Sequence, residues 1–194
     1  GAGKTSVMQA WMEWLLGKAS LGGGGWAADT RLMYVSNTAH QAYRVSNAIK
    51  APIESNRLYR AIFPKVKPHK EKWSQEEWKV AGNVTKDANF FATGVGGPAL
   101  GARALYIIYD DIADQENQGT KNQREVLIDW LEKTAEPILV PWGRQVMTCT
   151  RWSWEDPANW AKGRGWRVLE EQALVDGASY WPERFPVEKL EELR

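Results

Sequence analysis

The sequence has 194 residues, of which 43% are hydrophobic and 25% are charged, a composition typical of a globular domain and not of a disordered chain. The 25 lysines and arginines nearly balance the 24 aspartates and glutamates. The net charge of +1 therefore gives no hint of a polyanionic partner, but it does not exclude one, because a nearly neutral protein can still carry a local basic groove. The single cysteine, Cys149, excludes a disulfide framework and a cysteine-based zinc site, and no apolar run reaches the ~18 residues that cross a bilayer.

The first third of the chain alternates helix-like and strand-like patterns. Apolar residues on one helical face predict helices, and short apolar runs between turn residues predict strands. Pro52 is expected to stop the second helix. The elements expected here are a helix over 6–18, a glycine turn over 22–25, a strand over 32–35, helices over 38–50 and 54–63, and a loop over 64–68.

The rest of the chain continues this alternation, with a glycine-rich segment, GVGGPALGAR, over 94–103. Strands that alternate with helices indicate an α/β fold with a mainly parallel sheet, in which ligands bind beyond the carboxyl ends of the strands. The expected elements are hairpin strands over 78–81 and 89–93, a buried strand over 104–109, a helix over 122–133, a buried strand over 144–148, a strand over 166–174 and a helix from 187 onward.

Three segments are expected to meet at this edge, and the first is GAGKTS (1–6). Gly3, Lys4 and Thr5 match the last three positions of the phosphate-binding pattern G-x-x-x-x-G-K-[ST]. In such a loop the backbone N–H groups face the phosphates, the lysine reaches the β- and γ-phosphates, and the threonine hydroxyl ligates Mg²⁺. Gly1 and Ser6 complete the expected nucleotide-binding set; a plain helix cap by Thr5 is the alternative. The first glycine of the pattern would precede Gly1, so we expect the chain to be a piece of a longer protein.

The other two segments end strands. LYIIYDD (105–111) carries Asp110, expected in the Mg²⁺ shell, and Asp111, expected to polarise the attacking water. Two adjacent carboxylates that face one site repel each other unless a cation lies between them, which favours a bound Mg²⁺. The alternative is a solvated strand end with an aspartate that caps a helix. VMTCTRWSWEDP (146–157) would place Thr150 and Arg151 near a γ-phosphate, or it is a strand followed by a turn.

Two compositional features remain open. The twelve tryptophans serve core packing, or some of them form an exposed surface for DNA or a partner protein; the candidates are Trp142, Trp152, Trp154 and Trp160. A basic cluster, Lys65, Lys67, Lys70 and Lys72, could contact DNA phosphates or could be a solvated loop.

The segments, in this order, resemble the ATPase domain of the large terminase subunits of tailed phages, which are DNA-packaging motors. The resemblance runs over nearly the whole chain. Three residues depart from the family pattern: Cys149 stands where glycine is usual, Ser153 where histidine is usual, and Asp111 where many relatives carry glutamate. The matching segments are GAGKTS, LMYVSNTAHQA, RAIFP, TGVGGPALGARALYIIYDDI, CTRWSWEDP and ALVDGASYWPERFP.

The resemblance implies an α/β P-loop NTPase fold of the RecA-like, ASCE type, a three-layer sandwich with a mainly parallel sheet. It implies a domain over 1–181, truncated at its N-terminus, and over 182–194 the start of a linker toward a nuclease domain. Thr150 and Arg151 would belong to the motif that couples hydrolysis to DNA movement. Arg103 would act on the ATP of a neighbouring subunit, unless it is a surface arginine that bonds carbonyls of the glycine-rich segment.

The implied activity is Mg²⁺-dependent ATP hydrolysis that moves double-stranded DNA into a procapsid. The implied partners are the DNA phosphate backbone, without sequence preference, the portal protein, the small terminase subunit and further copies of the chain in a ring. The implied location is the bacterial host cytoplasm and, during packaging, the procapsid portal. A helicase or recombination-type P-loop ATPase and an inactive fragment are the alternatives.

Overall fold

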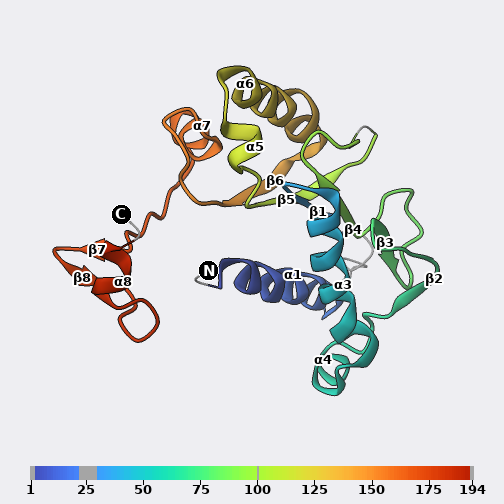
Figure 1. Ribbon diagram of the computed structural model, residues 1–194. Helices are drawn as coiled ribbons and strands as arrows, with labels where there is room; N and C mark the ends of the chain where they lie inside the picture. Colours follow the sequence, from blue (N-terminus) through green and yellow to red (C-terminus); the bar gives the residue numbers. More distant parts are fainter. Residues whose placement is uncertain (1–2, 22–29, 100, 193–194) are drawn as a thin grey trace. The chain divides into compact units, whose positions relative to one another are not determined.

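The computed structural model describes residues 3–21, 30–99 and 101–192. It contains β1 (Leu32–Ser36), β2 (Pro68–Trp73), β3 (Glu77–Val80), β4 (Phe90–Gly94), β5 (Ala104–Asp110) and β6 (Leu139–Thr148). These strands form one sheet in the order β2–β3–β4–β1–β5–β6 (Figure 1). The pairings from β4 to β6 are parallel, and β3 pairs antiparallel with both β2 and β4. The expected α/β fold with a mainly parallel sheet is therefore confirmed.

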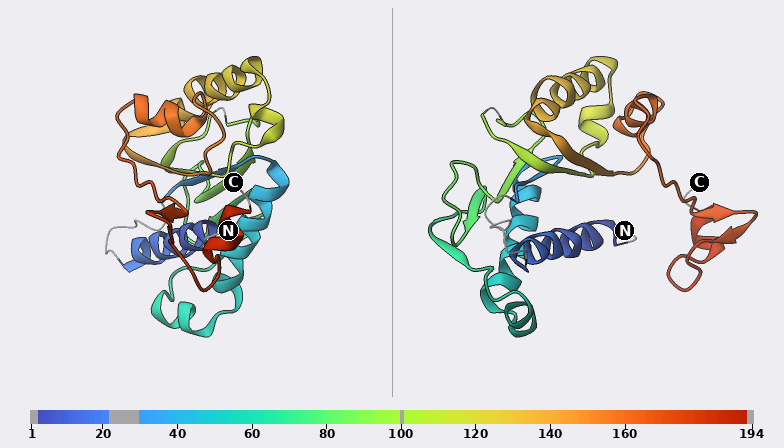
Figure 2. Two further views of the ribbon diagram at one scale, coloured as in Figure 1. Left: turned by 60° about the vertical axis from the view of Figure 1, so that its left-hand side comes forward. Right: turned by 180° about the vertical axis from the view of Figure 1, so that it is seen from behind.

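Helices flank the sheet. On one side lie α1 (Lys4–Leu21), α3 (Ala39–Ser55) and α4 (Arg57–Ile62); α5 (Gln115–Gln118) and α6 (Lys121–Trp130) lie on the other side (Figure 2). Every residue of β1 is buried, as expected for a strand covered on both faces. Leu32 and Tyr34 of β1 share a core cluster with Met12 of α1 and Ile49 of α3. This packing holds the middle of α1 against β1 and α3.

The chain divides into two compact units, Gly1–Trp160 and Ala161–Arg194. The helix α7 (Pro157–Gly163) spans the division. The second unit contains the short antiparallel strands β7 (Leu174–Val175) and β8 (Ala178–Ser179), followed by α8 (Val187–Glu191). The predicted boundary at residues 181 and 182 stays a prediction.

Pro52 lies inside α3, so the expectation that it stops this helix is wrong. A proline inside a helix costs ~3 kcal/mol, because it removes one backbone hydrogen bond and crowds the preceding turn. The buried residues Ile49 and Ile53 offset that cost by packing this part of α3 into the core. The next helix consequently begins later than residue 54, at Arg57, after Asn56 caps it.

The strand β2 is absent from the sequence-based expectations, which place only a loop up to residue 68. Its sequence, PHKEKW, lacks alternating apolar residues because β2 forms an edge of the sheet and most of its residues are exposed. Lys70 and Lys72 therefore lie on a strand, and Lys65 and Lys67 lie in the segment before it. The expected hairpin of β3 and β4 is confirmed.

Further corrections concern the second half of the chain. The strand expected over 144–148 is longer and is an edge strand that is only half-buried, since Pro141 and Gly143 are tolerated at an edge. The strand expected over 166–174 is wrong: this stretch is mostly exposed and has no strand partner before Leu174. The helix expected over 122–133 ends at Trp130 and continues as a π-helical turn (Leu131–Ala135) and a 3-10 turn (Glu136–Ile138).

The glycine turn expected over 22–25 lies outside the described residues. Within the described ranges, none of the helices has the length and the apolar composition required to cross a membrane.

Candidate functional site

The first turn of α1 meets the carboxyl ends of β5 and β6 at one edge of the sheet. Asp110 ends β5, Thr148 ends β6, and Lys4 and Thr5 begin α1. The parallel register places Asp110 opposite Thr148 on one side and opposite Ser36 of β1 on the other. The structure therefore brings together the three segments that the sequence predicts at this edge.

Asp110 is the centre of this arrangement. Its side chain accepts a hydrogen bond from the Thr5 hydroxyl at 2.6 Å and one from the Tyr34 hydroxyl at 2.6 Å, both on Oδ2. The hydroxyl of Thr148 donates to the other oxygen, Oδ1. Burial raises the pKa of Tyr34 above its ordinary value, and the hydrogen bond to Asp110 raises this pKa further, so the phenol stays a neutral donor. Asp110 thus links α1 to two neighbouring strands.

Lys4 points across the end of β6. Its Nζ donates to the Cys149 carbonyl at 3.0 Å, lies 3.5 Å from Thr150 Oγ1 and forms an ion pair with Asp111 Oδ1 at 3.8 Å. The Lys4 and Asp111 side chains are 40% and 55% exposed, so this pair adds only about 0–1 kcal/mol to stability. A solvent-accessible ammonium group at the N-terminus of a long helix is well placed to attract a phosphate.

Asp111 leaves the strand in an unusual backbone conformation. Its φ of 45° lies in the left-handed region, which residues other than glycine seldom adopt, and such residues cluster at functional sites. Its backbone N–H donates to the Thr148 carbonyl at 2.9 Å. Burial raises the pKa of the Asp111 carboxyl, Lys4 lowers it, and neighbouring Asp110 raises it again, with a net increase. The carboxylate is therefore a better proton acceptor than an ordinary aspartate.

Residues 149–156, which follow β6, form a loop that folds around Asp156. The buried Asp156 carboxylate accepts hydrogen bonds from Arg151 Nε at 3.0 Å and from the backbone N–H groups of Trp152, Ser153 and Asn159 at 2.9, 3.3 and 2.9 Å. Burial alone would raise the pKa of Asp156, but these hydrogen bonds outweigh it and hold the pKa below its usual range. The loop is thereby shaped so that Cys149 and Thr150 face Lys4.

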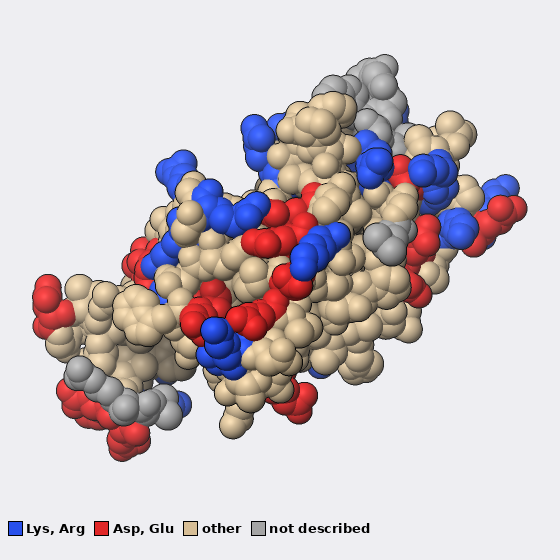
Figure 3. All heavy atoms as spheres, turned by 90° about the horizontal axis from the view of Figure 1, so that it is seen from above, with Lys and Arg blue, Asp and Glu red and all other residues tan. Residues whose placement is uncertain are grey.

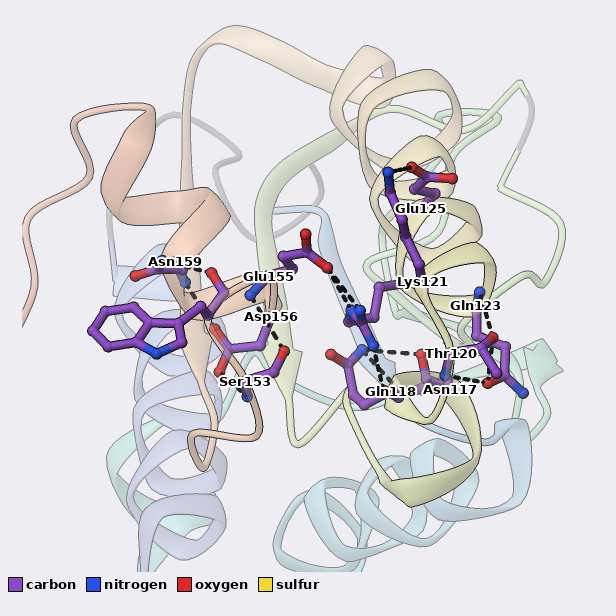
Figure 4. A network of polar contacts seen from close by, with 12 residues as sticks. Asn117, Gln118, Thr120, Lys121, Gln123, Glu125, Ser153, Glu155, Asp156 and Asn159 are labelled. Atoms are coloured by element: carbon purple, nitrogen blue, oxygen red, sulfur yellow. Dashed lines mark hydrogen bonds and ion pairs between the residues drawn. The ribbon is translucent and has the colours of Figure 1, made fainter.

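The same loop is attached to the helices beyond it. Arg124 of α6 donates to Glu155 Oε2 through Nε at 3.0 Å and Nη2 at 2.7 Å, and its Nη1 donates to the Gln118 carbonyl at 2.9 Å. Figure 4 shows Glu155 reaching toward Gln118 and the helices, while Asp156 lies beside Ser153 on the loop. Thr120 begins α6 with a capping box completed by Gln123. The loop after β6 is therefore braced by α6.

The other predicted site residues lie in different surroundings. Gly1 is outside the described residues, while Gly3 has φ of +79°, a conformation that favours glycine. Ser6 is exposed on α1. Arg103 is exposed just before β5, and seven residues of strand place it about 23 Å from Asp110. Arg103 therefore lies away from the site of its own chain, and its action on a neighbouring subunit stays a prediction.

Several residues of this edge are not singled out by the sequence. Ser36 Oγ donates to the Asp110 backbone carbonyl at 3.1 Å, and Asn37 Nδ2 donates to Asp114. In the sequence, Tyr34 is simply one residue of the strand predicted over 32–35. The signal that could have identified it is its register: Tyr34 lies two residues before Ser36, the partner of Asp110, and therefore on the same face of the sheet.

The donor set at this edge fits a magnesium ion. The Thr5 hydroxyl and the Asp110 carboxylate are hard oxygen donors, and Mg²⁺ commonly uses one or two protein groups together with waters and phosphate oxygens. In the part of the chain that the structure describes, no group of three or more histidine, cysteine, aspartate or glutamate side chains could hold a metal ion. The residues that would hold Mg²⁺ beside a nucleotide are Thr5 and Asp110, because they supply these oxygen donors.

The remaining surface candidates divide between exposed and paired side chains. Trp154 is 81% exposed, and Trp142 and Trp152 are also exposed, whereas Trp160 donates to Glu132 at 2.8 Å. Basic and acidic side chains lie intermixed on the face drawn in Figure 3. The four lysines of the predicted basic cluster are all exposed, and their contact with DNA stays a prediction: Lys65, Lys67, Lys70 and Lys72.

The comparisons with known proteins place the chain in no family. No family model matches the sequence, and no curated protein matches it either. The geometry of the site and the resemblance of its motifs are therefore the basis for a functional assignment.

Proposed function

We propose that this chain is a Mg²⁺-dependent ATPase of the P-loop class, with the RecA-like three-layer fold that its motifs suggest. The observation that carries the proposal is the hydrogen bond of 2.6 Å between Thr5 and Asp110. It joins the Gly-Lys-Thr segment to the end of a buried strand, although 104 residues lie between them. P-loop enzymes hold Mg²⁺ with just such a hydroxyl and a strand-end aspartate.

The roles of the residues follow from their positions. Lys4 binds the phosphates, and Thr5 and Asp110 hold Mg²⁺, which neutralises charge that develops on the phosphates. Asp111 polarises and orients the attacking water, since its carboxylate lies 3.8 Å from the Lys4 Nζ that binds the phosphates. Thr150 and Arg151 belong to the loop that responds to the nucleotide, because Thr150 lies 3.5 Å from Lys4 Nζ.

We further propose that the activity drives packaging of viral DNA, as in the large terminase subunits that the motifs resemble. The chain would then grip the phosphate backbone of double-stranded DNA without sequence preference, since a motor has to hold every sequence. It would work in a ring of copies at the portal of a procapsid, with a small terminase subunit, in the bacterial cytoplasm. Arg103 would complete the site of the adjacent copy.

Nucleotide binding tests the first step of this proposal. The chain is titrated with a fluorescent ATP analogue in Mg²⁺ and in EDTA. Lys4→Ala should weaken binding about tenfold or more, because a hydrogen bond to a charged group contributes ~1.5–3 kcal/mol. Lys18→Ala is the matched control, since Lys18 lies at the other end of α1 and contacts Trp14. Equal affinities of the two variants would contradict the proposal.

A further inference from the structure

Asp110 has two hydroxyl partners that the proposed reaction does not use directly. We infer that Tyr34 and Thr148 are positioning residues that fix the Asp110 carboxylate for a divalent cation, an inference that rests on the proposed function. Tyr34 donates to Oδ2 at 2.6 Å and Thr148 donates to Oδ1. Each carboxylate oxygen therefore has its own protein donor, independent of Thr5.

The two donors come from the strands on either side of β5. Thr148 is opposite Asp110 in the register of β6 with β5, and Tyr34 precedes the β1 residue opposite Asp110 by two positions. Both hydroxyls thus belong to strands that pair directly with β5, the strand that carries Asp110. A donor on each side restricts rotation of the carboxyl group, which one donor alone would permit.

Packing fixes the hydroxyl of Tyr34 in place. Tyr34 is 1% exposed, and its ring stacks against Phe90 with 6.4 Å between centroids. The ring therefore has no route to solvent, and a buried hydroxyl without a partner costs free energy. Asp110 Oδ2 is its hydrogen-bond acceptor.

The arrangement matters most once a cation is bound. In the structure Thr5 Oγ1 donates directly to Asp110 Oδ2. If the Thr5 hydroxyl also ligated Mg²⁺ through a lone pair, it would have to serve the cation and the carboxylate at once, and its contact alone would hold only one oxygen of Asp110. Tyr34 and Thr148 would hold Oδ2 and Oδ1 in that state, as hydrogen-bonding partners behind metal ligands do in other proteins.

The alternative is that Tyr34 is a core tyrosine whose hydroxyl is merely satisfied by Asp110. Tyr109→Phe distinguishes the two roles as a matched control. Tyr109 is also fully buried, precedes Asp110 on β5, and donates its hydroxyl to Gln145 at 2.8 Å. Tyr34→Phe and Tyr109→Phe both remove one buried hydroxyl, but only Tyr34→Phe removes a donor to Asp110.

The experiment measures binding of a fluorescent ATP analogue to the whole chain as Mg²⁺ is varied, with thermal unfolding of each variant recorded alongside. Tyr34→Phe should raise the Mg²⁺ concentration at half-saturation about 10–100-fold, the usual effect of removing a partner of a metal ligand. Binding in EDTA should be unchanged. Tyr109→Phe should leave the Mg²⁺ dependence at the wild-type value. The same Mg²⁺ dependence in all three proteins would overturn the inference.

A second pair keeps the test valid if Tyr34→Phe does not fold. Thr148→Ser retains the hydroxyl and should behave as wild type, whereas Thr148→Val removes it and should shift the Mg²⁺ dependence in the same direction as Tyr34→Phe. Identical Mg²⁺ dependence of Thr148→Ser and Thr148→Val would refute the role of that donor. A wild-type chain that binds no nucleotide would instead refute the proposed function, which separates the two failures.

Discussion

Asp156 organises the loop after β6, and its replacement by asparagine should destabilise the chain measurably. The carboxylate is fully buried and accepts four hydrogen bonds, including one from Arg151 Nε at 3.0 Å. Asparagine removes the negative charge that Arg151 Nε contacts and replaces one acceptor oxygen by a donor. We expect Asp156→Asn to lower the free energy of unfolding by about 3 kcal/mol, the upper end for hydrogen bonds to a charged group, because Asp156 is buried although Arg151 is 37% exposed.

The effect should depend on pH in a defined direction. Although burial alone would raise the pKa of Asp156, the hydrogen bonds from Trp152, Asn159 and Arg151 hold it below its ordinary value. The stability that a depressed carboxyl pKa confers is complete above the unfolded-state value of ~3.9 and is lost as the pH falls through the folded-state pKa. The difference in stability between wild type and Asp156→Asn should therefore be largest near neutral pH and should narrow below about pH 4.

Urea denaturation followed by far-ultraviolet circular dichroism measures the free energy of unfolding and its dependence on pH. In thermal unfolding, a loss of about 3 kcal/mol corresponds to a fall in Tm of about 6–12 °C for a chain of this size. Asp129→Asn is the matched control, because the exposed Asp129 side chain at the end of α6 pairs with the exposed Lys133 in the next turn. Its loss should change stability by less than about 0.5 kcal/mol. Equal stabilities of the two variants at pH 7, or a difference that grows on acidification, would refute the reasoning.

Three further variants probe the fold and the site. Gly94→Ala should destabilise the chain by about 1–3 kcal/mol in urea denaturation, because a Cβ there would lie 2.5 Å from the backbone N of Ala39, whereas Gly163→Ala meets no atom within 4 Å and should have little effect. Arg103→Ala should leave ATP-analogue affinity unchanged and remove turnover that depends on assembly; unaltered turnover in a ring would reject its role. Arg124→Gln should weaken the attachment of the loop at residues 149–156 to α6, detected as faster backbone amide exchange of that loop without a change in the exchange of β1.

That the segments of the candidate site meet in space was easier to predict than the full extent of the fold. GAGKTS and LYIIYDD identify residues that meet in space, because a helix start and a strand end have strong local signatures. Tyr34 could not be recognised in the same way. Its hydroxyl reaches Asp110 only because of the parallel register between β1 and β5. That register is a long-range property that a single sequence does not display.

The errors in the fold share a physical cause. Pro52 ends a helix by local preference, but the burial of Ile49 and Ile53 outweighs that preference. Apolar residues do not alternate along β2, because β2 is an edge strand and most of its residues are exposed. The hydrophobic pattern of the sequence therefore does not predict its pairing with β3. Tertiary contacts therefore decided the elements that local patterns assigned wrongly.

Steady-state ATP hydrolysis, measured with and without double-stranded DNA, tests the central claim most directly. The wild-type chain is compared with Lys4→Ala and Asp111→Asn, each in Mg²⁺ and in EDTA. The proposed function predicts Mg²⁺-dependent turnover that is lost in both variants and is stimulated by DNA. Absence of nucleotide binding and hydrolysis in the folded wild-type chain, or turnover that survives both substitutions, would contradict it.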